Sequence, residues 1–289
     1  MNKSRSLNLS VAFFVIPFMA IYLIFQIYPL FQAVFASFFN WDLLTSGKKF
    51  IGFKNYSKMF TDPIFWRSFL NTLQFVVYST PLLIATGLLF AILFNGTGSR
   101  KGTFRTVFFA PYVFSVSVTT LIWGFMFNPQ KGLLGAFSRI LGAEPIYWLT
   151  DPHFAMAAII ICTLWWTVGF NMVLFLAGLQ DIDPSLYEAS ALEGAGAWQN
   201  FIHITLPGLR RTLELVTVLQ IIASFQIFGQ VYILTKGGPG GTTRVLIQYI
   251  YETGFRDYAL GYASAMAFVL FVAMFLVSML QLTFAEEKA

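Results

Sequence analysis

Few residues in this sequence carry side chains suited to catalysis or metal binding. The chain has one cysteine, Cys162, and two widely separated histidines, His153 and His203. One cysteine excludes an internal disulfide framework and a cysteine-based metal cluster, and two distant histidines make a poor metal site. An enzyme within the apolar segments would need a histidine or acidic cluster, and the sequence shows none there. We therefore expect no metal site, no redox chemistry and no catalytic residues.

The remaining chemistry lies in neutral polar side chains within long apolar segments. They are Thr163, Asn171, Gln220, Ser224, Gln226, Gln230, Tyr262 and Ser264. An unpaired polar group is costly in lipid, so each should face another helix or a wet cavity. Hydrogen bonding between helices is one explanation. The other is a path for a neutral polar solute, whose hydroxyls would exchange hydrogen bonds with amides and hydroxyls while Trp165 and Trp166 offer flat apolar faces. A sugar presents both kinds of surface.

The elements that position these groups are predicted to be membrane-spanning helices. Of the 289 residues, 57% are hydrophobic and 11% are charged, whereas soluble domains carry about 25% charged residues. A helix that crosses the ~30 Å hydrocarbon core needs about 20 mostly apolar residues. Six stretches fit, namely 9–39, 69–94, 104–127, 154–179, 213–235 and 259–284. The sequence predicts an all-α polytopic membrane protein with six transmembrane helices in one domain, 1–289.

The first apolar stretch is predicted to be an uncleaved span, because its length of about 30 residues exceeds the roughly 7–15 residues of a signal-peptide core. Six spans place both termini on one side of the membrane. The N-terminal tail and the turn 95–103 are purely basic, which favours a cytoplasmic N-terminus. The loop 40–67 holds five Lys and Arg residues and argues the other way. Charge alone therefore leaves the orientation open.

Ionisable side chains are almost absent from the predicted spans; Glu214 lies about one turn inside the fifth. Ion-coupled carriers and proton pumps need intramembrane groups that bind and release a charge near the bilayer centre. This absence disfavours an ion-driven carrier or channel, which we keep as the alternative.

The polar segment 180–212, between the fourth and fifth spans, is predicted to hold a short exposed helix. Asp183 is a good N-cap, Pro184 suits the first helical position, and Gly194 can end the helix. Small side chains such as that of Ala189 project little from this helix, so another protein's backbone could approach it closely. Taken alone, such a helix is also explained as a simple connection between spans.

The spacing within this segment resembles the EAA loop of binding-protein-dependent ABC transporter permeases. Glu188-Ala189-Ser190 is followed after three residues by Gly194, after nine more by Ile204, and after one more by Leu206-Pro207. Serine replaces the third alanine of the motif. Segments 50–56, 62–66, 71–72, 127–129 and 234–239 are similar to those of the carbohydrate-uptake branch, the maltose-type and glycerol-phosphate-type permeases. The resemblance covers nearly the whole chain.

The resemblance implies a type I ABC importer permease with a cytoplasmic coupling helix at 183–196 that docks on an ATPase subunit. The coupling residues implied are Tyr187, Glu188, Ala189, Ser190, Gly194, Ile204, Leu206 and Pro207. Both termini would be cytoplasmic, in the cytoplasmic membrane of a bacterium or archaeon. The implied partners are a second homologous permease subunit, two ATP-binding subunits, an extracellular solute-binding protein and membrane lipid, and no nucleic acid. The implied function is import of a carbohydrate, with an oligosaccharide as the expected class.

ATP and Mg²⁺ are expected on the partner subunits rather than on this chain. The sequence has no Gly-x-x-x-x-Gly-Lys-Ser/Thr stretch, and the Gly-Gly-Pro-Gly-Gly run 237–241 lacks the following lysine. We interpret that run as a turn in an outer loop.

The resemblance to maltose-type permeases also implies a solute site midway through the membrane. Its candidate residues are Tyr112, Thr163, Trp166, Thr167, Phe170, Gln220 and Ser224. Helical spacing independently places the four candidates between 163 and 170 on one face, at i, i+3, i+4 and i+7, and Gln220 with Ser224 at i, i+4. Several positions that hold Asn, Gly or Ser in the maltose transporter hold other residues here, so maltose itself is not predicted.

Overall fold

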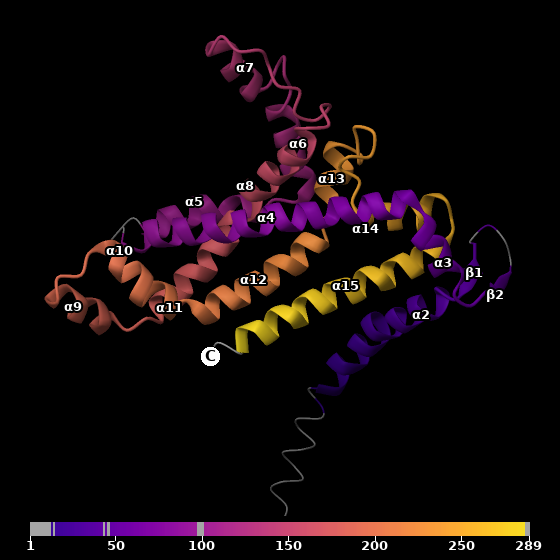
Figure 1. The fold of residues 1–289 in the computed structure, drawn as a ribbon, viewed down its shortest axis with the longest axis horizontal. Helices are drawn as coiled ribbons and strands as arrows, with labels where there is room; N and C mark the ends of the chain where they lie inside the picture. Colours follow the sequence, from indigo (N-terminus) through magenta and orange to yellow (C-terminus); the bar gives the residue numbers. More distant parts are fainter. Residues whose placement is uncertain (1–12, 14, 43, 45–46, 97–100, 287–289) are drawn as a thin grey trace, which may run out of the picture. The chain divides into compact units, whose positions relative to one another are not determined.

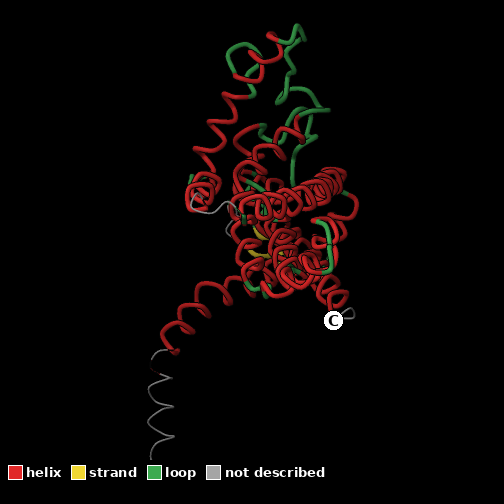
Figure 2. The backbone as a smooth tube through the Cα atoms, turned by 90° about the vertical axis from the view of Figure 1, so that its left-hand side faces the viewer, coloured by secondary structure: helices red, strands yellow, loops and turns green. Residues whose placement is uncertain are grey.

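The computed structural model describes residues 13, 15–42, 44, 47–96 and 101–286, and most of them form helices (Figure 1, Figure 2). The chain divides into two compact units. One is formed by Met1–Pro63 and Ile250–Val272, and the other by Ile64–Tyr249 and Ala273–Ala289. A single domain over 1–289 stays a prediction.

The smaller unit contains a short β-hairpin between helices. Its elements are η1 (Leu23–Ile27), α2 (Tyr28–Ala36), β1 (Phe39–Trp41), β2 (Lys48–Phe50), α3 (Lys54–Thr61), η4 (Glu252–Arg256) and the first part of α15 (Leu260–Glu286). The two strands pair antiparallel, with Phe39 opposite Phe50. The buried Asn55 amide donates to the carbonyl oxygens of Ser37 at 2.8 Å and Phe39 at 3.0 Å. These bonds fasten α3 to the start of the hairpin.

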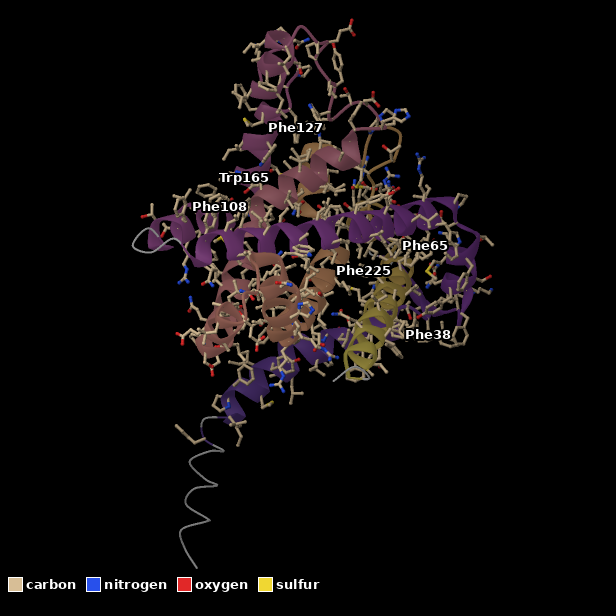
Figure 3. All side chains as sticks on the ribbon, turned by 60° about the vertical axis from the view of Figure 1, so that its left-hand side comes forward. Phe38, Phe65, Phe108, Phe127, Trp165 and Phe225 are labelled. Atoms are coloured by element: carbon tan, nitrogen blue, oxygen red, sulfur yellow. The ribbon has the colours of Figure 1, made fainter. Side chains whose placement is uncertain are left out.

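The larger unit holds the remaining helices. They are α4 (Pro63–Asn95), α5 (Lys101–Val113), α6 (Val116–Met126), α7 (Leu133–Ile140), α8 (Ala155–Gln180), α9 (Pro184–Leu192), α10 (Ala197–Asn200), η3 (Phe201–Thr205), α11 (Leu206–Gly208), α12 (Arg210–Phe225), α13 (Gly229–Leu234), most of α14 (Leu246–Tyr251) and the last part of α15. Aromatic rings pack around α6 and α8: the Trp123 and Trp165 rings meet edge to face at 6.0 Å, and buried Phe127 lies 5.6 Å from Trp148 (Figure 3).

α8 is the most buried of the candidate spans, with 56% of its most apolar window inside the larger unit. It packs closely against α5. A Cβ atom at Gly169 would collide with the backbone carbonyl of Phe108, so only glycine allows this approach. α8 therefore forms the central support of this unit.

The fold class is confirmed. Five helices of the described chain are long and apolar enough to cross a membrane, and the pair α5 and α6 is a sixth candidate if it counts as one span. The five are Val15–Ala36, Pro63–Asn95, Ala155–Gln180, Arg210–Leu234 and Leu260–Gln281. Residues 9–12 and 14 of the predicted first span lie outside the described residues.

The predicted third span, 104–127, corresponds to two helices, α5 and α6, rather than to one. α5 and α6 meet at a bend of 98°. Pro111 has no N–H to donate within α5, which weakens the helix just before its end. Ser115 then adopts an extended conformation and accepts a hydrogen bond from the Val118 N–H at 3.4 Å, so it caps a new helix.

The predicted fifth span, 213–235, also differs from the structure. α12 begins earlier, at Arg210, and ends at Phe225. α13 starts only at Gly229, so residues 226–228 interrupt the helix. The remaining long spans agree with the prediction to within a few residues, except that α4 begins six residues earlier, at Pro63.

Replacement of Gly169 by alanine is expected to destabilise the packing of α8 on α5. The added methyl group meets backbone rather than a movable side chain, and overpacking of this kind costs about 1–3 kcal/mol. The midpoint of thermal unfolding of the purified protein in detergent should fall. Gly102→Ala in α5 is the matched control, because a Cβ there meets nothing within 4 Å. Equal midpoints for the two variants would contradict the close approach.

Candidate functional site

A cavity of about 470 Å³ lies within the larger unit. It adjoins the break between α5 and α6 and the break between α12 and α13. Its lining residues are Phe75 from α4; Tyr112 and Val116 from α5 and α6; Thr163, Trp166 and Thr167 from α8; Gln220, Ala223 and Ser224 from α12; Gln226, Ile227 and Phe228 from the break; and Gly229 and Gln230 from α13. The helix breaks therefore bring backbone and side chains of four spans to one place.

Six of the seven predicted solute-site residues line this cavity, and Phe170 does not. Phe170 instead stacks on the ring of Tyr112, with centroids 4.9 Å apart and planes within 16°. Phe170 therefore packs against a residue that lines the cavity. The structure thus brings the predicted set together, whereas its role in binding a solute stays a prediction.

The polar side chains beside the cavity bond to one another across three helices. The Asn171 amide of α8 donates to Gln220 of α12 at 3.1 Å, and the Gln220 amide donates to Ser224 at 3.3 Å. The Ser224 hydroxyl also lies 3.2 Å from the hydroxyls of Ser79 and Thr80 in α4. All five residues are buried. These bonds give each of the five side chains a polar partner, as a polar group inside a membrane protein requires.

Trp166 bonds to the backbone at the break between α5 and α6. Its indole Nε1–H donates to the carbonyl oxygen of Phe114 at 3.1 Å. A carbonyl at a helix break inside a membrane has no helical donor, so a neighbouring side chain must supply one. Trp166 therefore holds the bend while its ring lines the cavity.

The cavity is neutral but rich in hydrogen-bonding groups. None of the described residues that line it is Asp, Glu, His, Lys or Arg. The hydroxyls of Thr163 and Thr167 donate to carbonyls of their own helix, each at 2.8 Å, and keep lone pairs for an incoming donor. Together with the glutamine amides and the aromatic faces, this arrangement suits a solute with many hydroxyls and apolar ring faces.

Sequence reasoning missed part of the lining. Gln226 and Gln230 were noticed as polar residues but not assigned to the site, and Phe75, Val116, Ala223, Ile227, Phe228 and Gly229 were not noticed at all. The two glutamines at i, i+4 carried a usable signal. The apolar members carried none, because they resemble any other residue of an apolar span.

The predicted coupling helix is present as α9. The Asp183 carboxylate accepts a hydrogen bond from the backbone N–H of Ser185 at 2.9 Å, which holds the pKa of Asp183 below its ordinary value. Pro184 occupies the first helical position. Past the C-terminal end, Gly194 has φ of +79°, a left-handed conformation that ends the helix.

The predicted coupling residues fall into an anchored group and an exposed group. The Tyr187 hydroxyl lies 2.9 Å from that of Thr205, and Tyr187 and Ile204 pack against a core cluster that includes Leu179 and Leu209. Ser190 is partly buried and donates to the Tyr187 carbonyl oxygen at 2.9 Å. The exposed members are Glu188, Ala189, Gly194, Leu206 and Pro207. The segment thus presents a surface while its base is fixed to α8 and α12.

A pocket of about 490 Å³ lies beside α9. Its lining residues are Leu186, Ala189, Ser190, Glu193, Gly194, Ala195, Gln199, Asn200, His203 and Ile204. Four of them, Ala189, Ser190, Gly194 and Ile204, are predicted coupling residues. The pocket therefore lies on the side of α9 that carries small side chains.

The run 237–241 is tied to α4. The Asn71 amide donates to the carbonyl oxygens of Gly241 and Arg244, each at 2.9 Å. The Thr72 hydroxyl accepts a hydrogen bond from the Leu246 N–H at 2.9 Å. Residues 71–72 of α4 are therefore hydrogen-bonded to the end of the glycine-rich run and to the residues that follow it.

Comparison with known proteins gives a consistent result. The family model described as "Binding-protein-dependent transport system inner membrane component" matches residues 3–286. The lactose transport system permease protein of Rhizobium radiobacter is 34% identical, over 95% of this chain and 93% of that protein. The trehalose/maltose transport system permease protein of Thermococcus litoralis is 33% identical, over 91% and 90%. The sulfoquinovosyl glycerol transport system permease protein of Agrobacterium fabrum is 36% identical, over 91% and 85%.

Solved structures share the fold. A chain of a bacterial alginate ABC transporter, in complex with alginate pentasaccharide-bound periplasmic protein, superposes with a TM-score of 0.86. The superposition covers 97% of this chain and 95% of that one, at 22% identity.

Replacement of Trp166 by phenylalanine is expected to destabilise the bend. The Phe114 carbonyl would lose its donor at the helix break, and one lost hydrogen bond costs about 0.5–1.5 kcal/mol. The thermal midpoint of the purified protein should fall below that of Trp165→Phe, which removes the same volume one residue away. The same midpoint for both variants would show that the bond does not support the break.

Proposed function

Because the chain belongs to the family of binding-protein-dependent transport system inner membrane components, we propose that it is the permease subunit of an ABC importer for a neutral carbohydrate. The observation that carries this proposal is the neutral, amide- and hydroxyl-lined cavity beside the breaks in two spans. Irregular backbone at membrane depth is characteristic of transporter binding sites. The chain itself would carry no catalytic step.

The carbohydrate class is supported by the relatives and by the cavity together. The relatives are named for the transport of lactose, of trehalose or maltose, and of sulfoquinovosyl glycerol. Sugar rings combine hydroxyl edges with apolar faces, which matches the side chains of Gln220, Gln230 and Trp166. A phosphorylated or acidic sugar would favour a cationic partner in the cavity, and its described lining offers none. Sulfoquinovosyl glycerol is itself anionic, so the cavity lining alone supports a neutral oligosaccharide as the proposed cargo.

The proposed partners are a second permease subunit, two ATP-binding subunits that hold ATP and Mg²⁺, and an extracellular solute-binding protein. α9 would dock on an ATP-binding subunit from the cytoplasm, which places both termini on the cytoplasmic side. Closure of the ATP-binding subunits would push on Glu188 and Gly194, and the attached helices would rock and change the side to which the cavity opens. Two observations support this role. Small side chains such as that of Ala189 are exposed on α9, and Tyr187 and Ile204 fix the segment to a buried core cluster.

The first experiment measures ATP hydrolysis by the assembled transporter over a panel of sugars carried by the cognate binding protein. We expect stimulation by neutral oligosaccharides and none by uronates or sugar phosphates. Gln220→Leu should raise the half-maximal sugar concentration roughly 3- to 10-fold, the effect of about 0.5–1.5 kcal/mol from one lost hydrogen bond. Gln281→Leu is the matched control, since its amide donates to the Glu214 carbonyl in the larger unit and does not line the cavity.

The same assembly separates the proposal from its alternative. Uptake into cells should vanish when the ATP-binding subunits are removed and should persist when the proton gradient is collapsed. The reverse pattern would contradict the proposal.

Replacement of Gly194 by valine is expected to uncouple transport. A left-handed conformation costs a residue with a Cβ about 1–2 kcal/mol, so the end of α9 should shift. Sugar uptake should fall at least about tenfold while the amount of inserted protein stays constant. Gly196→Ala is the control, because Gly196 has φ of −79° and accommodates a side chain. Unchanged uptake in Gly194→Val would count against the coupling role of α9.

A further inference from the structure

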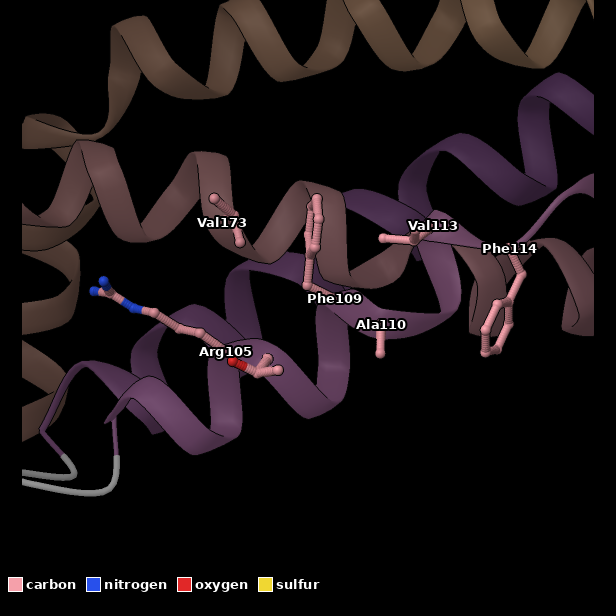
Figure 4. A pocket seen from close by; sticks show the side chains of 7 residues that line it. Arg105, Phe109, Ala110, Val113, Phe114 and Val173 are labelled. Atoms are coloured by element: carbon pink, nitrogen blue, oxygen red, sulfur yellow. The ribbon is translucent and has the colours of Figure 1, made fainter.

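A second hollow of the larger unit, outside the cavity described above, runs along α5 beside α8 and has a volume of about 550 Å³ (Figure 4). Its lining residues are Arg105, Thr106, Phe109, Ala110, Val113, Phe114 and Val173. We call it the α5 groove. Arg105 lies at one end and Phe114 at the other. We propose that the α5 groove binds one anionic phospholipid, with the phosphate at Arg105 and an acyl chain along the apolar floor.

The distribution of polarity along the groove matches that of a phospholipid. Apart from Arg105, the one polar side chain of the lining is Thr106, and its hydroxyl already donates to the Gly102 carbonyl oxygen at 3.0 Å. Every other lining residue is apolar, and Ala110 leaves room between larger neighbours. The groove therefore has a cationic end followed by an uninterrupted hydrocarbon surface.

Among the residues that the structure describes, the Arg105 side chain has no hydrogen-bond or ion-pair partner. Its Nε atom is shielded from solvent. A guanidinium carries five N–H donors, and phosphate oxygens bind it bidentately. An anionic headgroup would satisfy the group that the protein leaves unpaired.

The length of the groove favours a lipid over a helix of another subunit. From Arg105 to Phe114 it covers ten residues, and the nine steps between them rise about 13 Å at 1.5 Å per residue. One leaflet contributes about 15 Å of the ~30 Å hydrocarbon core. The groove stops where the chain bends by 98° into α6. Its length therefore matches that of an acyl chain in one leaflet, whereas a transmembrane helix of a partner would need a surface that crosses both leaflets.

The site is tested by photo-labelling of the assembled transporter in bilayers of phosphatidylcholine that contain phosphatidylglycerol with a diazirine on its acyl chain. The labelled peptide should contain α5, and Arg105→Gln should reduce the labelling at least fivefold. Arg105→Lys should keep part of it. Arg211→Gln is the matched control, since Arg211 is an exposed basic residue that does not line the groove.

A second pair of variants tests the acyl chain independently of the charge. Ala110→Phe should fill the floor of the groove and remove the labelling as Arg105→Gln does. Val107→Phe is its control, because Val107 is exposed on the same helix outside the groove. Excess inorganic phosphate should not compete, which separates a lipid from a free anion.

Three results would overturn the proposal. One is labelling that Arg105→Gln and Ala110→Phe both leave unchanged. Another is equal labelling by phosphatidylcholine that carries the same diazirine. The third is a cross-link from Ala110→Cys, in a Cys162→Ser background, to the second permease subunit, which would show that protein covers the groove.

Discussion

A backbone carbonyl or amide that has lost its helical partner inside a bilayer has no water to bond to, and this constraint governs the centre of the protein. Two spans are interrupted there, one at the bend between α5 and α6 and one at residues 226–228. Each interruption is tolerable only where protein groups or a wet cavity take the place of the missing bonds. Trp166 supplies such a bond to the Phe114 carbonyl. The cavity exists because the breaks exist, and the breaks persist because α8 supports them.

The polar network bears on how the proposed site would bind a solute and also release it. Asn171, Gln220 and Ser224 are bonded to one another. A solute hydroxyl would therefore exchange one hydrogen bond for another, and a single hydrogen bond contributes only about 0.5–1.5 kcal/mol net. At the proposed site, selectivity would come from several such exchanges together with contact on the rings of Tyr112 and Trp166. No single contact would hold the solute, which suits a site that must empty in each cycle.

The sequence was informative where the signal is local. Asp183, Pro184 and Gly194 defined α9 because capping and left-handed turns depend on a few neighbouring residues. The face that carries Thr163 and Trp166 followed from helical spacing.

The breaks were not predictable in the same way. Hydropathy runs without change across Ser115, and proline is tolerated inside membrane helices, so Pro111 does not by itself place a bend. Pro81 lies inside α4, which continues to Asn95. The hairpin of β1 and β2 was missed because each strand has three residues and gains part of its stability from a contact across the pair, in which the Lys48 ammonium lies 3.3 Å from the Trp41 ring centroid. Phe75 belongs to the cavity through tertiary packing alone.

α8 gives the proposed coupling a physical route. It is one uninterrupted helix from Ala155 to Gln180, with Thr163 and Trp166 at the cavity and its C-terminal end leading directly into α9. From Thr163 to Gln180 it spans about 25 Å. Buried Leu179 and Leu209 lock its end to the start of α12, and the Asn171 to Gln220 bond joins the same two helices nearer the cavity. Because closely packed helices transmit displacement rather than absorb it, a push on α9 would move α8 and α12 together and would change both walls of the cavity at once.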